Sequence, residues 1–211
     1  LLYRLGLGDA GGWSDKMCAT LSVPMSMLPQ IRQNADDFGT SEESLFGKAL
    51  PILSAAGDQQ SALVGQACLE PGTAKITYGT GAFVLANRGS TPPIQQSGPG
   101  DTGLLATLGF QVGSKRHYAI EGSVFVTGAT VQWLRDGLGI ISNPAETSDM
   151  ALMAGSNEGV YFVPAFVGLG APHWQPYATA SITGMTRGTS QHHIVRAALE
   201  ATAYQVKDVV G

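Results

Sequence analysis

Residues 56–60 read Ala-Gly-Asp-Gln-Gln, and further along the chain residues 78–81 read Tyr-Gly-Thr-Gly. The first stretch places the carboxylate of Asp58 beside two amides, directly after the short apolar run 51–56. The second places the hydroxyl of Thr80 between two glycines, which allow positive φ and let the backbone approach an anion closely. Phosphoryl transfer to a hydroxyl needs at least two groups: a carboxylate that takes a proton from the alcohol, and a loop whose backbone approaches the phosphate oxygens. Together the two stretches indicate a phosphoryl-transfer site.

Each motif also has a purely structural interpretation. Asp58 can cap the helix that follows it, and the segment 79–81 can be an ordinary hairpin turn. A third motif lies downstream, where Gly128 and Gln132 are four residues apart and share one face of a predicted helix. Gly128 lets a ligand lie against that helix and Gln132 can hydrogen-bond it, but a helix packed through a small residue has the same pattern. These alternatives stay open for each motif taken alone.

The composition limits the classes of protein to which this chain can belong. The chain has 211 residues, 44% hydrophobic and 13% charged, with a formal net charge of -4. This is ample apolar material for a core, and the mild acidity argues against a broad nucleic-acid surface. The apolar stretches are too short to span a membrane, which takes about 20 residues. The high glycine content, 28 residues, suits an α/β enzyme with many short connections.

The first residue is Leu1, and no charged region leads into an apolar signal segment. We therefore expect an internal piece of a longer cytoplasmic protein. Cys18 and Cys68 form no CxxC motif, so we expect two reduced, buried thiols.

Hydrophobic periodicity and turn residues predict an α/β chain. Helices are expected from a capped start at Ser14 and over 59–69, 124–138 and 190–210. Strands are expected over 50–56 (buried), 74–77, 82–86, 104–112, 117–122, 159–165 and 181–185. Along the predicted helix 124–138, the residues Val131, Leu134 and Leu138 share one side. A change of composition over 65–81 suggests a boundary between two lobes, and a carboxylate there would lie in a cleft.

Several further motifs do not indicate a dinucleotide-binding or metal site. Residues 6–11 match GxGxxG, but they follow too short a strand and lack a clearly placed acidic residue downstream, so we interpret them as a loop. His192 and His193 are adjacent rather than at metal-ligand spacing, and His117 and His173 have no evident cysteine or carboxylate partner. We predict no metal-ligating residues in the chain.

Five stretches, in the same order along the chain, resemble the glycerol kinases of the FGGY carbohydrate kinase family: 56–60, 78–81, 121–136, 163–174 and 186–188. The resemblance runs from about Trp13 to the last residue. It implies an actin-like, ribonuclease H-like ATPase fold of two lobes, with substrates in the cleft between them. Residues 1–66 would end the first, substrate-binding lobe, and residues 67–211 would form most of the second, nucleotide-binding lobe.

The resemblance also implies roles for individual residues. Asp58 would be the base that deprotonates a glycerol hydroxyl, Gln59 would bind glycerol, and Phe83 would pack on its carbon skeleton. ATP and Mg²⁺ would be the cofactors. The nucleotide would be bound by a larger set of residues, namely Gly79, Thr80, Gly81, Gly128 and Gln132.

The chain departs from the family in two ways. It lacks the N-terminal phosphate loop and the later adenosine-binding glycine loop, so we expect these 211 residues to be inactive alone. Residues 40–48 lack the Gly-Gly-Lys loop that binds fructose bisphosphate in some relatives, and no histidine precedes Phe38 where other relatives are phosphorylated. Neither form of regulation is expected.

The resemblance implies glycerol and ATP as binding partners, and we expect a homo-oligomer for the full-length protein. Two alternatives remain, a sister kinase of another polyol or sugar and a related binding protein that has lost catalysis.

Overall fold

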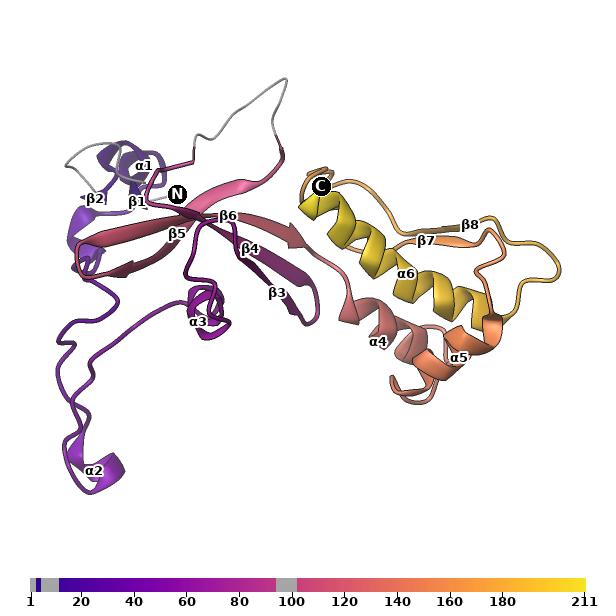
Figure 1. Ribbon diagram of the computed structural model, residues 1–211, viewed down its shortest axis with the longest axis horizontal. Helices are drawn as coiled ribbons and strands as arrows, with labels where there is room; N and C mark the ends of the chain where they lie inside the picture. The colour runs from indigo at the N-terminus through magenta and orange to yellow at the C-terminus, as the bar shows by residue number, and fades with distance from the viewer. Residues whose placement is uncertain (1–2, 5–11, 94–101) are drawn as a thin grey trace. The chain divides into compact units, whose positions relative to one another are not determined.

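The computed structural model describes residues 3–4, 12–93 and 102–211 (Figure 1). The predicted GxGxxG loop at 6–11 lies outside these residues. The strands are β1 (Tyr3–Arg4), β2 (Gly12–Trp13), β3 (Ala74–Tyr78), β4 (Ala82–Gly89), β5 (Leu105–Val112), β6 (Lys115–Val124), β7 (Tyr161–Val163) and β8 (Ser181–Thr183). The helices are α1 (Asp15–Thr20), the 3-10 turn η1 (Met25–Met27), α2 (Glu43–Phe46), α3 (Asp58–Gly65), α4 (Gly128–Asp136), α5 (Glu146–Ala154) and α6 (Gln191–Val210).

The chain forms two compact units, each built from separate segments. Unit 1 comprises Leu1–Lys75, Ala86–Gln95 and Ala106–Ile120, and unit 2 comprises Ile76–Leu85, Gln96–Leu105 and Glu121–Gly211. Since the division falls within strands β3 to β6, it does not test the lobe boundary at residue 66, which stays a prediction.

The four longest strands form one sheet in the order β3-β4-β6-β5. The two predicted strand pairs are therefore confirmed, with short connections at 79–81 and at the turn that follows β5. In that second turn Gly113 has a φ of 58°, a left-handed conformation that glycine adopts without steric penalty.

Unit 1 contains two helices that the sequence anticipates. The side chain of Ser14 accepts a hydrogen bond from the backbone N–H of Met17 at 3.3 Å, which confirms the predicted cap of α1. Helix α3 buries Leu63 completely. Cys18 and Cys68 are both free thiols and both buried, as predicted.

The buried strand predicted over 50–56 is wrong. The segment makes only isolated bridges with 35–40, and Ile52 and Leu53 are 43% and 62% exposed. Its hydrogen-bonding partner is itself a polar, mostly exposed segment, so the pairing covers neither face of the apolar run. Pro51 also has no N–H to donate, which weakens any regular ladder here.

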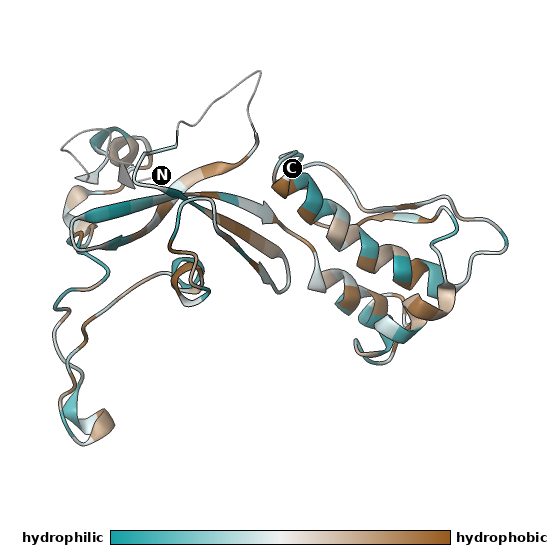
Figure 2. Ribbon diagram, viewed as in Figure 1, coloured by the Kyte–Doolittle hydropathy of each residue, from teal (hydrophilic) through white to brown (hydrophobic). Residues whose placement is uncertain are grey.

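The core of unit 2 forms around the last helix, which the sequence predicted. Alanines on α6 let it pack closely against α5 and β7, and Leu134 of α4 and Phe162 of β7 join the same cluster. Figure 2 shows hydrophobic and hydrophilic residues alternating along α6, as an amphipathic helix requires. His193 has a structural role at its start, since its Nδ1 accepts the backbone N–H of Ser190 at 3.0 Å.

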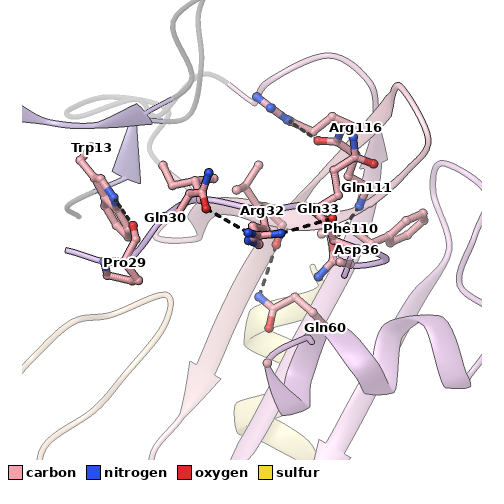
Figure 3. Close-up of a pocket in the computed structure, with 15 residues that line it drawn as sticks. Trp13, Pro29, Gln30, Arg32, Gln33, Asp36, Gln60, Phe110, Gln111 and Arg116 are labelled. Atoms are coloured by element: carbon pink, nitrogen blue, oxygen red, sulfur yellow. Dashed lines mark hydrogen bonds and ion pairs between the residues drawn. The ribbon is translucent and has the colours of Figure 1, made fainter. Parts of the chain in front are cut away.

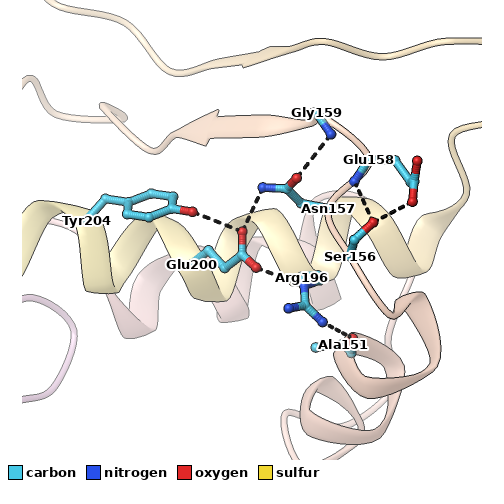
Figure 4. A network of polar contacts seen from close by, with 8 residues as sticks. All are labelled: Ala151, Ser156, Asn157, Glu158, Gly159, Arg196, Glu200 and Tyr204. Atoms are coloured by element: carbon cyan, nitrogen blue, oxygen red, sulfur yellow. Dashed lines mark hydrogen bonds and ion pairs between the residues drawn. The ribbon is translucent and has the colours of Figure 1, made fainter.

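A polar network ties α6 to the end of α5 and the turn that follows it (Figure 4). Arg196 donates to Glu200 at 2.8 Å and to the carbonyl of Ala151 at 3.0 Å. Glu200 also accepts from Asn157 at 2.8 Å and from the hydroxyl of Tyr204 at 3.2 Å. Glu200 therefore fixes the turn onto the helix.

The expectations differ from the structure around α4 and α5. The helix predicted from residue 124 begins at Gly128, because the chain continues as strand β6 to Val124. Leu138 lies beyond the helix and is 42% exposed, so it does not share the buried side with Leu134. Helix α5 was not predicted, although Glu146 and Asp149 in its first turn and Gly155 at its C-cap are typical helix signals.

Candidate functional site

The turn between β3 and β4 is held against the start of α4, within unit 2. The carbonyl of Gly79 accepts the backbone N–H of Gly128 at 3.0 Å and the hydroxyl of Thr127 at 3.1 Å. The carbonyl of Thr80 accepts the N–H groups of Thr127 at 2.9 Å and Ala129 at 3.1 Å. The structure thus brings together two motifs, 79–81 and 128–132, that are far apart in the sequence.

Steric contact explains why positions 81 and 128 are glycines. A Cβ atom on Gly128 would lie 2.5 Å from the carbonyl oxygen of Gly79, and one on Gly81 would lie 2.4 Å from that of Val124. Real Cβ atoms essentially never approach so closely. Neither Gly79 nor Gly81 is among the described residues with positive φ. The glycines therefore serve close backbone approach rather than an unusual φ.

Some polar groups of the turn and of α4 remain available to bind a ligand. The turn carbonyls occupy the N–H groups at the start of α4, so the helix start itself offers few donors to an anion. Gly79 and Thr80 are exposed, and among the described residues the hydroxyl of Thr80 has no hydrogen-bond partner. Gln132 is also exposed, one helical turn beyond Gly128.

Phe83 follows the same turn, on β4. Its neighbours Ala82 and Val84 are buried in a cluster with Val124 and Val209, whereas Phe83 is half-buried. Because successive strand residues point to opposite faces, Phe83 lies on the face away from that cluster.

Asp58 is the first residue of α3, in unit 1, and is exposed. Its Oδ1 accepts the backbone N–H of Gln59 at 2.8 Å. The carboxylate therefore bonds one free N–H of the first helical turn, but it is not the N-cap, which is Gly57 and makes no side-chain cap hydrogen bond. Its second oxygen makes no hydrogen bond within the described part of the chain.

Gln59 contacts a residue that the sequence did not single out. Lys75 of β3 is only 4% exposed, and its Nζ donates a hydrogen bond to Oε1 of Gln59. The sequence carried no signal for this burial, since strand alternation places Lys75 on the opposite face from the apolar Ala74 and Ile76 and so predicts an exposed lysine.

Unit 1 also contains a pocket of about 730 Å³ (Figure 3). Gly57 and Gln60 line it, whereas Asp58 and Gln59 between them do not. Its polar side chains largely bond to the protein: Arg32 donates to Gln30 at 3.1 Å, Arg116 to Gln111 at 3.2 Å, and Gln60 to the carbonyl of Leu108 at 3.3 Å. The pocket is therefore distinct from the predicted site residues.

One histidine has a carboxylate partner that the sequence analysis missed. Nε2 of His173 lies 3.1 Å from Oδ2 of Asp208, which is 35 residues away and joins it only through the fold. No group of three or more metal-ligating side chains gathers in the described part of the chain. None of its helices is long and apolar enough to cross a membrane.

Comparison with known proteins gives a family match. The model of the C-terminal domain of the FGGY family of carbohydrate kinases matches residues 74–211. The chain is 52% identical over 198 residues to glycerol kinase 2 of Thermotoga maritima, covering 94% of this chain and 39% of that protein. It is 49% identical over 200 residues to a glycerol kinase of Methylobacterium nodulans, covering 95% of this chain and 39% of that protein. The chain thus spans about two fifths of the length of these relatives.

Solved structures agree on the fold. The chain matches the Plasmodium falciparum glycerol kinase with ADP at a TM-score of 0.81 and 42% identity, over 94% of this chain and 39% of that one. It also matches a ligand-bound xylulose kinase of Lactobacillus acidophilus at a TM-score of 0.75 and 21% identity, over 94% of this chain and 40% of that one. The mixed α/β architecture is therefore that of these kinases.

Proposed function

This chain belongs to the FGGY family of carbohydrate kinases, and we propose that the full-length protein phosphorylates glycerol with ATP to give sn-glycerol 3-phosphate. One observation carries the choice of substrate. Identity is 52% and 49% to two glycerol kinases, but 21% to a xylulose kinase of the same fold. Asp58 of unit 1 and the turn at Gly79 of unit 2 are proposed to supply the chemistry that this reaction needs.

Asp58 is proposed to be the general base. Its Oδ1 is held by the N–H of Gln59, which fixes the carboxylate while the exposed second oxygen stays free for a hydroxyl. Proton acceptance by a positioned carboxylate contributes typically about 10²–10⁴-fold to rate. Phosphoryl transfer otherwise depends on positioning and electrostatic stabilisation. Gln59 would hold a second hydroxyl, and Phe83 would cover the carbon skeleton.

The turn at 79–81 is proposed to bind the nucleotide phosphates. It is fixed to α4 through its carbonyls, so its exposed outer side is rigid before a ligand arrives. The hydroxyl of Thr80 faces no described partner and can bond a phosphate oxygen. Gly128 and Gln132 would line the same nucleotide site. The ADP in the Plasmodium falciparum glycerol kinase structure supports a nucleotide for this fold.

Mg²⁺ is the metal expected with ATP. Magnesium is usually bound through one or two carboxylates together with substrate phosphates. We assign the ion no residue of this chain. A cytoplasmic location and a homo-oligomeric state stay predictions.

The test is ADP release by the purified full-length protein with MgATP and a panel of glycerol, dihydroxyacetone, erythritol, xylulose and gluconate. A strong preference for glycerol is expected. Preference for another member would replace the substrate but keep the kinase. Release with none of them would contradict the proposed function and favour a binding protein.

A further inference from the structure

Strand β3 has an unusual burial pattern, with a charged side chain buried and apolar side chains exposed. Lys75 is 4% exposed, whereas Ile76 is 38% and Tyr78 is 58% exposed. Lysine is almost never fully buried unless it is paired, because removing an ammonium group from water is costly. A buried lysine on a strand that exposes an isoleucine and a tyrosine therefore requires a reason in its contacts.

One contact of the buried ammonium group is with Gln59. The Nζ of Lys75 donates to Oε1 of Gln59. An ammonium group has three donors and no acceptor, so only the oxygen of the carboxamide can face it. This removes the usual ambiguity between the two ends of a glutamine amide. The amide nitrogen of Gln59 must then point away from Lys75, and it can only donate.

We propose that Lys75 is a positioning residue, which orients the carboxamide of Gln59 so that its nitrogen donates to a hydroxyl oxygen of the substrate. The inference rests on the proposed function. Asp58 and Gln59 then present unlike groups from consecutive positions, an acceptor and a donor. A vicinal diol matches this pair, because one hydroxyl can donate to Asp58 while its neighbour accepts from Gln59.

The first test is a double-mutant cycle in the full-length protein, using Lys75→Met and Gln59→Ala alone and together. Lys75→Met keeps an unbranched side chain of nearly the same length and removes the donor. We expect it to raise the KM for glycerol about tenfold, in line with one lost hydrogen bond, and to leave the KM for ATP unchanged. In the Gln59→Ala background the same change should add little, because Lys75 acts through Gln59.

The second variant, Gln59→Glu, retains a partner for Lys75 and so does not threaten folding. It replaces the donor that faces the substrate with an acceptor. We expect a glycerol KM at least about tenfold higher, with an unchanged melting temperature or a higher one. A glycerol KM near that of the wild type would overturn the proposed orientation, even if Lys75→Met fails to fold.

The outcomes separate the two proposals. If wild-type protein phosphorylates glycerol but the effects of Lys75→Met and Gln59→Ala simply add, Lys75 has a general structural role and the inference is wrong. If wild-type protein does not phosphorylate glycerol at all, the proposed function fails, and this inference fails with it.

Discussion

The carbonyl oxygen of Gly79 accepts the backbone N–H of Gly128 at 3.0 Å, across 49 residues of sequence. This bond holds the β3–β4 turn on the first residue of α4. It is possible only because position 128 has no Cβ, which would lie 2.5 Å from the same oxygen. Gly128 therefore has a role in holding the turn that is separate from its proposed place in the nucleotide site.

Gly128→Ala is expected to push the turn away from α4 and to raise the KM for ATP about tenfold or more, with a smaller change in the KM for glycerol. Steady-state kinetics of the full-length protein measures both. Gly65→Ala is the matched control, because Gly65 lies in a helix with nothing within 4 Å of its Cβ position. Equal effects of the two substitutions on the KM for ATP would contradict the steric role of Gly128.

Thr80→Val removes the exposed hydroxyl while keeping the shape of the side chain. Loss of one hydrogen bond to a charged phosphate is worth about 1.5–3 kcal/mol, so ATP should bind about 10- to 150-fold more weakly. The melting temperature without nucleotide should not change, because the hydroxyl has no partner in the described part of the chain. Isothermal titration with ATP tests this, and Thr80→Ser, which keeps a hydroxyl, should bind nearly as wild type.

Leu134→Ala tests the core of unit 2. Leu134 of α4 is fully buried in a cluster with residues of α6 and β7, and truncating such a leucine costs about 2–5 kcal/mol. Leu152→Ala on α5 is the control, because Leu152 is 75% exposed and its loss should change stability by less than about 0.5 kcal/mol. Denaturant unfolding of the full-length protein compares the two. Similar losses for both variants would show that the core lies elsewhere.

Tyr204 gives a pH-dependent prediction. Reduced hydration, followed by the charge of Glu200 and the hydrogen bond to it, raises the pKa of Tyr204 above its ordinary value of 10.0. A raised pKa favours the protonated phenol in the folded state, so its contribution is present below pH 10 and lost as the pH rises through the folded pKa. The melting temperature of wild type should exceed that of Tyr204→Phe at neutral pH, and this difference should shrink above pH 10. A constant difference up to pH 11 would contradict the prediction.

Regular elements with clear periodicity could be predicted from the sequence. The two strand pairs of the sheet, the capped helix α1 and the long helix α6 were confirmed, because alternation, caps and turn glycines act locally. The apolar run at Ile52 and Leu53 misled for a physical reason. Hydrophobicity predicts burial only when a second surface is available to cover the run, and in the described structure none covers this one.

Contacts between distant residues could not be predicted. Nothing in the spacing of His173 and Asp208 reveals their pairing. The link between Lys75 and Gln59 joins side chains 16 residues apart, on β3 and α3. The steric reason for a glycine at position 128 could not be predicted from the sequence either. The sequence suggested that Gly128 lets a ligand lie against α4, which stays a prediction. The structure adds a second reason for the glycine, since a Cβ atom there would lie 2.5 Å from the carbonyl oxygen of Gly79.

The central claim is that Asp58 takes the proton of a glycerol hydroxyl, and Asp58→Asn tests it most directly. Asparagine keeps an oxygen that can accept the N–H of Gln59, so α3 should remain intact. Turnover of glycerol by the full-length protein, followed by ADP release, is expected to fall by about 10²–10⁴-fold, while the Kd for ATP stays within about twofold of wild type. Near-normal turnover by Asp58→Asn would contradict the assignment of Asp58 as the base.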